Sequence, residues 1–437
     1  MNTTVEGMNN VLSTVATKDT ITELNLGLKD LGDKLLVVAT VTAAGEQVSL
    51  NLPCKKPADW DGQPVTIGVK SQTFSAVVTS LLKFKEDIYI DITGNVVKAG
   101  VEKKAEVTLD TVAELPQKIE GGETILQFVM KDADLQSFIR KGLTTGAQEA
   151  RDDGTSNAVL TIDMSDGEAR GTMVGFSTTR YITSLGRGKA LLPKAPEGNE
   201  AAAKQIEAME QAFDAYCAKT GQDKSALAIV MPVVSIKHLQ TLAQGQAQVL
   251  FAVTEKYVNV SLGNVGVYTF RQGAKAPAKA QQMEAIVGQA TQGAIKVGFD
   301  AAAIGNAVSF INDMDKLDGT LGKKAVHLTV SGDGLMIISG NNDKAETSVK
   351  VLNGGGDADM YVNGQLLKEA LAVLDKGNVV VSFGAGLLLL QNGTVTEGVS
   401  NTALAFIMAV KPAVEEPAEE TESDEAETSD ETADAAE

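Results

Sequence analysis

Few residues in the chain have the types and spacing that catalysis or metal binding requires. There are 2 His and 2 Cys among 437 residues, and Cys54 and Cys217 form no Cys-x-x-Cys pair. His238 has no second His or Cys at the spacing of a metal site. His327 lies in an alternating apolar stretch and is expected on the exposed side of a strand. We therefore predict no metal site and no cofactor.

Two glycine-rich stretches superficially resemble ligand-binding loops. At 186–189 (Gly-Arg-Gly-Lys) the P-loop pattern fails, because the first glycine and the Ser or Thr after the lysine are both absent. Asp357 and Asp359 could suggest a cation site, but we favour a glycine-rich connection between two strands. No Gly-x-Ser-x-Gly motif occurs, and no nucleophile lies beside a plausible base. We predict that the protein is not an enzyme.

The negative charge of the chain is concentrated at its C-terminal end. The formal net charge is −19, but residues 415–437 hold 12 of the 57 acidic residues and none of the 38 basic ones, so residues 1–414 carry −7. Such a segment buries too little apolar surface to fold, and we predict a disordered acidic tail at 413–437. The mildly acidic remainder argues against an open, strongly basic nucleic-acid surface, but it allows DNA held loosely inside an enclosure.

The overall composition is typical of a cytoplasmic protein with several domains. A length of 437 residues with 43% hydrophobic residues suffices for two to four domains of roughly 100–200 residues each. No signal peptide is recognisable near Met1, and the longest apolar runs, such as 385–390, are far too short to span a bilayer. Two cysteines without a disulfide framework fit a reducing compartment. We expect a cytoplasmic location and no membrane partner.

An amphipathic helix followed by two alternating strands recurs six times along the chain. In the helix at 71–82, Phe74, Val78 and Leu81 share one face. The six predicted helices cover residues 8–17, 71–82, 132–150, 234–244, 299–314 and 364–374. The strand pairs that follow them join 35–41 with 47–52, 88–92 with a strand ending at 101, 158–164 with 169–176, 249–253 with 258–262, 326–330 with 335–339, and 379–383 with 387–390.

The six units group into three tandem domains. Helices and sheets each have one apolar side and bury it against each other, and the short turns between strands favour antiparallel pairing. We therefore predict an α+β fold of three domains, each a duplicated helix-plus-antiparallel-strands unit. The spacing of the strong helices, which begin at 71, 234 and 364, indicates an insertion at 185–225 with a helix near 200–219. The predicted domains are residues 1–117, 118–282 and 283–412, followed by the acidic tail at 413–437.

This organisation resembles the β sliding clamp of bacterial DNA polymerase III. The matching segments over residues 8–412 are Val174–Tyr181 (VGFSTTRY), Ile229–Pro232 (IVMP), Ile407–Pro412 (IMAVKP) and the helix at 366–374 with the strand at 378–383. Arg180 and Tyr181 stand at the Arg and Leu of the family's V-A-T-D-G-H-R-L-like run, and Met408 matches a methionine of its closing V-M-P-M-R-L run. Ser-Thr-Thr replaces Asp-Gly-His in the first run, so the chain is identified as a divergent member of the family.

The resemblance implies a non-catalytic processivity factor that encircles duplex DNA and tethers the replicative polymerase. Two subunits are expected to close head to tail as a homodimer, domain 1 against domain 3, so that twelve helices line a central hole. DNA is then retained topologically, without sequence specificity, and we expect the protein on the nucleoid. The DNA-binding candidates are basic residues on or beside the lining helices: Lys18, Lys83, Lys85, Arg140, Lys141, Arg151, Lys237, Lys368 and Lys376.

The resemblance also implies an apolar cleft between domains 2 and 3 for short peptide motifs of the polymerase and the clamp loader. Carried over residue by residue, this cleft contains Phe176, Arg180, Tyr181, Pro232, Ile236, Leu387, Met408 and Val410. A methionine-bearing groove accepts several related peptides because the thioether chain repacks easily. The acidic tail starts beside the cleft, and we expect it to screen the cleft, or the access of DNA, electrostatically.

Two other functions are compatible with parts of the sequence. Glycine-rich repeated strands also suit a structural homo-oligomer, such as a shell or fibre protein, which would polymerise and ignore DNA topology. An enzyme would need a convergent polar pocket, and the scarcity of His, Cys and catalytic motifs argues against one. A ring-shaped particle distinguishes the clamp from both alternatives.

Overall fold

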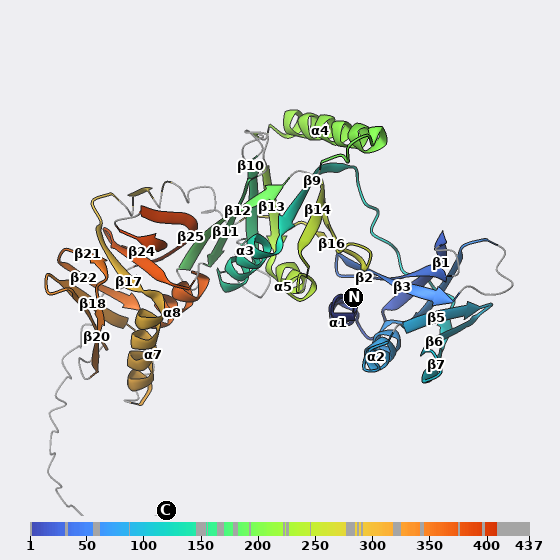
Figure 1. Cartoon of the computed structure of the whole chain (residues 1–437), viewed down its shortest axis with the longest axis horizontal. Helices are drawn as coiled ribbons and strands as arrows, with labels where there is room; N and C mark the ends of the chain where they lie inside the picture. Colours follow the sequence, from blue (N-terminus) through green and yellow to red (C-terminus); the bar gives the residue numbers. More distant parts are fainter. Residues whose placement is uncertain are drawn as a thin grey trace, which may run out of the picture.

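The computed structural model describes most of the chain as three domains joined in an arc (Figure 1). No helix among the described residues is both long and apolar enough to cross a membrane. Residues outside the description are 1, 31–33, 56–61, 87, 146–153, 155, 164–169, 178–181, 192–193, 222, 224–226, 245, 277–284, 286–287, 290–291, 318–324, 341–344, 375, 396–397 and 409–437. Only the backbone is described for 2–4, 27–30, 34, 53–55, 137, 141, 144–145, 170–177, 182–191, 315–317 and 398–408.

Domain 1 packs two helices against strands that pair antiparallel, except where β3 pairs parallel with β5 at Cys54 and Ile90. Its elements are α1 (Asn2–Val15), β1 (Ile21–Asp30), β2 (Lys34–Ala43), β3 (Glu46–Lys55), β4 (Val65–Lys70), α2 (Ser71–Leu82), β5 (Ile88–Thr93), β6 (Val96–Val101), β7 (Ala105–Leu109) and β8 (Thr111–Val112). The predicted pairs are present, since β2 pairs with β3 and β5 with β6. Phe74, Val78 and Leu81 are buried on α2, as its apolar face predicts.

Domain 2 repeats this arrangement and adds one long helix. Its elements are β9 (Thr124–Lys131), α3 (Asp132–Thr145), β10 (Asn157–Asp163), β11 (Arg170–Ser177), β12 (Ile182–Leu191), α4 (Glu200–Thr220), β13 (Leu227–Pro232), α5 (Val233–Leu242), β14 (Gln248–Thr254), β15 (Tyr257–Ser261) and β16 (Gly266–Arg271). β10 pairs with β11 and β14 with β15, again as predicted.

Domain 3 contains the last two helix-and-strand units. Its elements are β17 (Ile295–Asp300), α7 (Ala301–Leu317), β18 (Ala325–Ser331), β19 (Leu335–Ser339), β20 (Glu346–Lys350), β21 (Asn353–Gly354), β22 (Ala358–Asn363), α8 (Gly364–Val373), β23 (Asn378–Phe383), β24 (Leu387–Thr394) and β25 (Gly398–Met408). α8 begins where the Asn363 side chain accepts a hydrogen bond from the Leu366 backbone N–H at 3.0 Å, which caps the helix.

The helix predicted near 200–219 is present as α4, but the insertion that contains it begins later than predicted. Residues 185–191 belong to β12, which pairs with β11 on one side and β25 on the other. The glycines and charges at 186–189 suggested a loop, whereas pairing with β11 along the whole stretch, and with β25 at Gly186, holds it in the sheet. α4 starts at an Asn199 cap, ends at Gly221 with φ 68°, and packs on β9 through Met209, Phe213 and Cys217.

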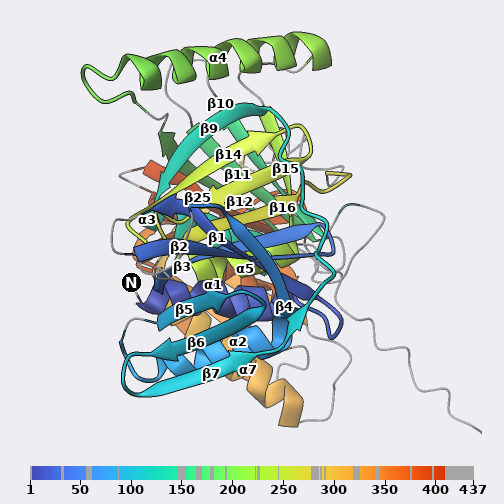
Figure 2. The same cartoon turned by 90° about the vertical axis from the view of Figure 1, so that its right-hand side faces the viewer.

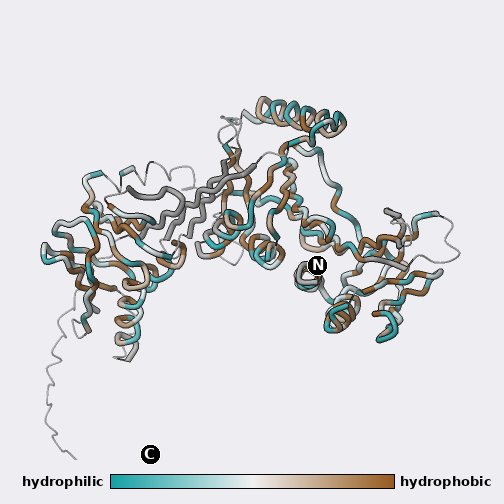
Figure 3. Tube along the Cα trace, viewed as in Figure 1, coloured by the Kyte–Doolittle hydropathy of each residue, from teal (hydrophilic) through white to brown (hydrophobic). Residues whose placement is uncertain are grey.

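Both domain junctions continue the sheet. β3 of domain 1 pairs antiparallel with β16 of domain 2, with Leu50 opposite Gly266, and β12 of domain 2 pairs antiparallel with β25 of domain 3, with Ile182 opposite Ile407. Hydrophobic and hydrophilic residues alternate along the helices and strands of this arc (Figure 3). The domains are therefore linked by strand ladders as well as by the chain.

The helices also form a continuous layer. α1 packs on α2, α3 on α5 and α7 on α8 within the domains, while α1 meets α5 and α3 meets α8 across the junctions. The resulting order, α2–α1–α5–α3–α8–α7, follows the concave side of the arc (Figure 1). The long helix α4 is separate, because it lies on the opposite, strand-bearing side (Figure 2).

The described apolar side chains form two buried clusters. One cluster includes Met8 and Leu50 of domain 1 together with Phe128, Phe251 and Phe270 of domain 2. The other belongs to domain 3. Domains 1 and 2 thus share a single hydrophobic core.

Candidate DNA interface and peptide cleft

Most of the predicted DNA-binding residues lie at the surface of the concave helix layer. Lys237 and Lys368 are exposed on α5 and α8. Exposed lysines that follow the ends of α1, α2 and α8 within a few residues are Lys18, Lys83, Lys85 and Lys376. Arg140 is half-buried on α3. The Lys141 side chain and the whole of Arg151 lie outside the described residues.

Acidic side chains share this layer with the lysines. Glu6 and Asp19 are exposed on and after α1, and Asp132 is exposed at the start of α3. A surface with both signs attracts phosphates weakly and at long range rather than holding them at fixed positions. The described part of the helix layer is therefore mixed in charge rather than strongly basic.

Strand register brings several predicted cleft residues to one end of neighbouring strands. Pro232 on β13 lies opposite Asn157 on β10. On the other side of β10, Ala158 pairs with Gly175 of β11, and Phe176 is the next residue along β11. Further across the sheet, Phe176 pairs with Thr183 on β12. On the domain 3 side, Leu387 of β24 lies opposite Met408 of β25, next to the rung that joins Ile407 to Ile182.

The remaining cleft candidates have different positions. Ile236 is fully buried in α5, so it supports the core rather than a surface. Arg180, Tyr181 and Val410 lie outside the described residues, and only the backbone is described for Phe176 and Met408. The cleft assignment for these residues stays a prediction.

Sequence reasoning missed a buried polar cluster at the junction of domains 1 and 2. Glu46, the first residue of β3, accepts hydrogen bonds on Oε1 from Ser235 Oγ at 2.8 Å and from the Tyr268 hydroxyl. The Nδ1 atom of His238 lies 3.2 Å from Glu46 Oε2 and 3.2 Å from the Tyr268 oxygen. Ser235 and Glu46 are 189 positions apart, so only the strand pairing of β3 with β16 reveals the contact.

Ser, His and Glu are the residue types of a catalytic triad, but their arrangement here is different. In a triad the serine hydrogen-bonds to the imidazole, whereas Ser235 donates to the carboxylate. Ser235, His238 and Tyr268 are also buried, which closes the cluster to a substrate.

Burial and hydrogen bonding act in opposite directions on Glu46. Burial raises its pKa, but hydrogen bonds from His238, Tyr268 and Ser235, with the charge of His238, lower it by more. The pKa of Glu46 therefore lies below its usual value. Burial and the neighbouring Glu46 charge raise the pKa of Tyr268.

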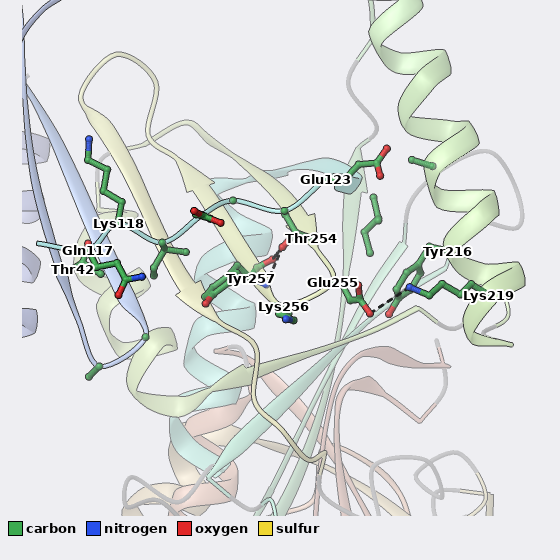
Figure 4. Close-up of a pocket in the computed structure, with 18 of the residues that line it drawn as sticks. Thr42, Gln117, Lys118, Glu123, Tyr216, Lys219, Thr254, Glu255, Lys256 and Tyr257 are labelled. Carbon is green, nitrogen blue, oxygen red and sulfur yellow. Dashed lines mark hydrogen bonds and ion pairs between the residues drawn. The ribbon is translucent and has the colours of Figure 1, made fainter. Parts of the chain in front are cut away.

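A pocket of about 880 Å³ lies on the side of the arc that carries α4 (Figure 4). It is enclosed by α4, the segment between domains 1 and 2, and the turns at 42–45 and 254–257. Tyr216 and Tyr257 line it, and Lys219 pairs with Glu255 at 3.8 Å. Its other charged side chains are Lys118, Lys256, Glu120 and Glu123, so neither sign of charge dominates.

The remaining residues that the sequence suggested for metal binding or catalysis have structural roles. The stretch 355–357 connects strands β21 and β22, as the favoured interpretation predicted. The Nε2 atom of His327 lies 2.9 Å from Asp359 Oδ2, and its ring stacks on Tyr361 with centroids 4.1 Å apart, so this histidine is half-buried rather than exposed. No cluster of three or more His, Cys, Asp or Glu side chains able to hold a metal occurs among the described residues.

Comparison with solved structures identifies the fold. A DNA polymerase sliding clamp from Bacillus subtilis matches with a TM-score of 0.65 and 17% identity, covering 93% of this chain and 96% of that one. The DNA polymerase III β subunit from Pseudomonas aeruginosa matches with a TM-score of 0.67 and 16% identity over 94% and 98%. A Helicobacter pylori β clamp bound to a DNA ligase peptide matches with a TM-score of 0.66 and 11% identity over 93% and 97%.

These likenesses define the chain as a protein with the sliding-clamp fold, in which three domains each duplicate a helix-and-strands unit. The particular version of the fold is that of the bacterial DNA polymerase III β subunit, as the sequence resemblance predicts. No family model and no curated protein sequence matches the chain.

Proposed function

We propose that this protein is a DNA sliding clamp that closes around duplex DNA as a head-to-tail homodimer and tethers a replicative polymerase. The observation that carries the proposal is the unbroken helix layer α2–α1–α5–α3–α8–α7 along the concave side of the arc. Two such arcs facing each other enclose a space lined by helices and walled by strands. Retention on DNA then follows from topology and needs neither catalysis nor a cofactor.

The two ends of the arc offer different surfaces for ring closure. In domain 1, β7 pairs only with β6 among the described strands and exposes Val107, which is 40% accessible. In domain 3, β20 pairs only with β19 among the described strands, and Leu335 and Leu352 nearby are 40% and 48% accessible. Free strand edges with exposed apolar residues invite pairing with another chain. Because the two ends differ, pairing them joins copies head to tail.

A sliding ring requires attraction to DNA without tight contact. The exposed lysines Lys18, Lys83, Lys85, Lys237, Lys368 and Lys376 supply positive charge on or beside the helix layer. The acidic residues between them reduce the net attraction, which keeps DNA mobile in the ring. We assign the same role to Arg140, Lys141 and Arg151.

We place partner binding at the junction of domains 2 and 3. Strand register gathers Pro232, Phe176, Leu387 and Met408 at one end of neighbouring strands. The matching Helicobacter pylori clamp is bound to a DNA ligase peptide. By this likeness the cleft takes short peptide motifs of the polymerase and the clamp loader. The protein acts in the cytoplasm, on the nucleoid.

Imaging combined with a topological assay tests the proposal. Negative-stain images are expected to show closed two-subunit rings. Protein assembled at high concentration on nicked circular DNA is expected to survive a high-salt wash and to be released when a restriction enzyme linearises the circle. The same DNA linearised beforehand is the control. Filaments or shells in the images, or equal retention on circular and linear DNA, contradict the clamp and favour a structural homo-oligomer.

A further inference from the structure

The junction between domains 1 and 2 carries more specific contacts than a flexible hinge needs. In the sheet layer, β3 pairs with β16, and the Asn51 backbone N–H donates to Val265 O at 2.8 Å. In the helix layer, α1 packs on α5 so closely that a Cβ on Gly7 would lie 3.1 Å from Thr241 O. Domains 1 and 2 are therefore in direct contact in both the sheet layer and the helix layer.

Glu46 lies between these two layers and connects them. Glu46 comes from domain 1, whereas all three of its side-chain partners, Ser235, His238 and Tyr268, come from domain 2. Ser235 lies in the first turn of α5, where the backbone N–H groups favour a negative charge. The carboxylate therefore links a domain 1 strand to both a helix and a strand of domain 2.

Burial makes this carboxylate difficult to replace. Tyr268 is fully buried, and Ser235 and His238 are 1% and 6% accessible. A buried donor that loses its acceptor has no water to replace it, so the loss costs more than the hydrogen bond itself contributes. The Glu46 carboxylate is the acceptor that Ser235 and Tyr268 share.

We propose that domains 1 and 2 form one rigid, cooperatively folded body that the buried Glu46 carboxylate pins together. The shared hydrophobic core of the two domains supports this independently of the polar cluster. The angle between the two domains is fixed by these contacts, so any bending or opening of the subunit takes place outside this junction. The inference concerns the single chain and does not depend on ring closure or DNA binding.

Interdomain distance distributions test the proposal directly. Spin labels at Glu102→Cys in domain 1 and Gln211→Cys on α4, in a background with Cys54→Ser and Cys217→Ala, report the distance by pulsed EPR. We expect a narrow distribution in the parent and a distribution at least twice as broad in Glu46→Gln. The matched control is Glu86→Gln, which removes an exposed carboxylate that pairs with Lys104 inside domain 1.

Thermal unfolding provides the second measurement. One transition is expected for domains 1 and 2 together, with the Tm lowered on the order of 5 °C by Glu46→Gln and unchanged by Glu86→Gln. Should Glu46→Gln fail to fold, Ser235→Ala removes a single donor and is expected to broaden the distances less. Unaltered distances in Glu46→Gln, or separate melting of domains 1 and 2 in the parent, overturn the proposal.

Discussion

At the scale of single residues, Glu46 is the centre of a buried polar cluster that joins domains 1 and 2. The carboxylate accepts two hydroxyl donors on one oxygen and faces His238 with the other. Tyr268 contributes its ring to the core as well, since it lies 5.5 Å from Phe270 between ring centroids. The contributions of the hydroxyl and of the ring of Tyr268 to stability can therefore be measured separately.

Tyr268→Phe is expected to destabilise the protein by about 1–3 kcal/mol, because Glu46 loses a charged-group hydrogen bond while the ring packing stays. Urea unfolding followed by circular dichroism measures the change. The control is Tyr257→Phe, which removes the hydroxyl of a half-buried tyrosine in the pocket beside α4. It is expected to change the free energy of unfolding by less than about 0.5 kcal/mol. Equal effects of the two substitutions contradict a special role for Tyr268.

Acid is expected to weaken the Glu46 contacts. The folded pKa of Glu46 lies below its unfolded value, so its contribution to stability is complete above the unfolded pKa and disappears as the pH falls through the folded pKa. The titratable groups coupled to Glu46 are His238 and Tyr268. In urea unfolding, the stability difference between the parent and Glu46→Gln should therefore shrink as the pH falls from neutral to below the unfolded pKa of about 4.3. A difference that stays constant over this range argues that the carboxylate is not the stabilising species.

At the scale of elements, the antiparallel pairing of β3 with β16 leaves no room for a side chain at Gly266. A Cβ on Gly266 would lie 2.1 Å from Ser49 O and 2.7 Å from Met8 Cε, and the backbone oxygen cannot move without breaking the ladder. The glycine therefore permits sheet and helix layers to meet at the junction.

Gly266→Ala is expected to destabilise the protein by about 1–3 kcal/mol or more, because the added methyl group meets backbone. Gly305→Ala on α7 is the matched control. Its Cβ has nothing within 4 Å, and alanine favours the helix, so a small gain of about 0.5–1 kcal/mol is expected there. Thermal unfolding compares the two, and a harmless Gly266→Ala would show that the strands can separate at low cost.

Periodicity predicted the helices and one strand pair per unit because each of these encodes its own apolar face. It did not predict flanking strands such as β4, β7 and β20. The helix at 71–82 agrees with α2 residue for residue, and the antiparallel pairs follow from alternation and short turns. The start of the insertion was wrong, because Gly186 and Gly188 have no apolar side chain to mark a strand that its neighbours hold in place. The Glu46 cluster and the pocket beside α4 depend on contacts between distant segments, which local patterns do not contain.

At the scale of the whole molecule, the proposed dimer depends on contacts between the two ends of the arc. Val107→Asp on β7 is expected to weaken the dimer at least tenfold, since a buried unpaired charge at an interface costs more than 1.4 kcal/mol. Sedimentation over a range of concentrations measures the dissociation constant. Val234→Asp on α5 introduces the same charge at a residue that is 51% accessible and far from either end, and it should leave the dimer intact. Dimers unaffected by Val107→Asp rule out this edge as the contact.

The shared end of strands β11, β13, β24 and β25 has a directional consequence. In the proposed ring, a half-turn about the axis of the DNA relates the two copies, so their strand ends lie at the same level along that axis and face the same way along it. A threaded ring then has a front and a back. On the proposed function, the orientation in which such a ring is placed on the duplex sets the direction along the DNA in which its bound partners face. Partners that bind at these strand ends compete for two equivalent sites, one on each copy.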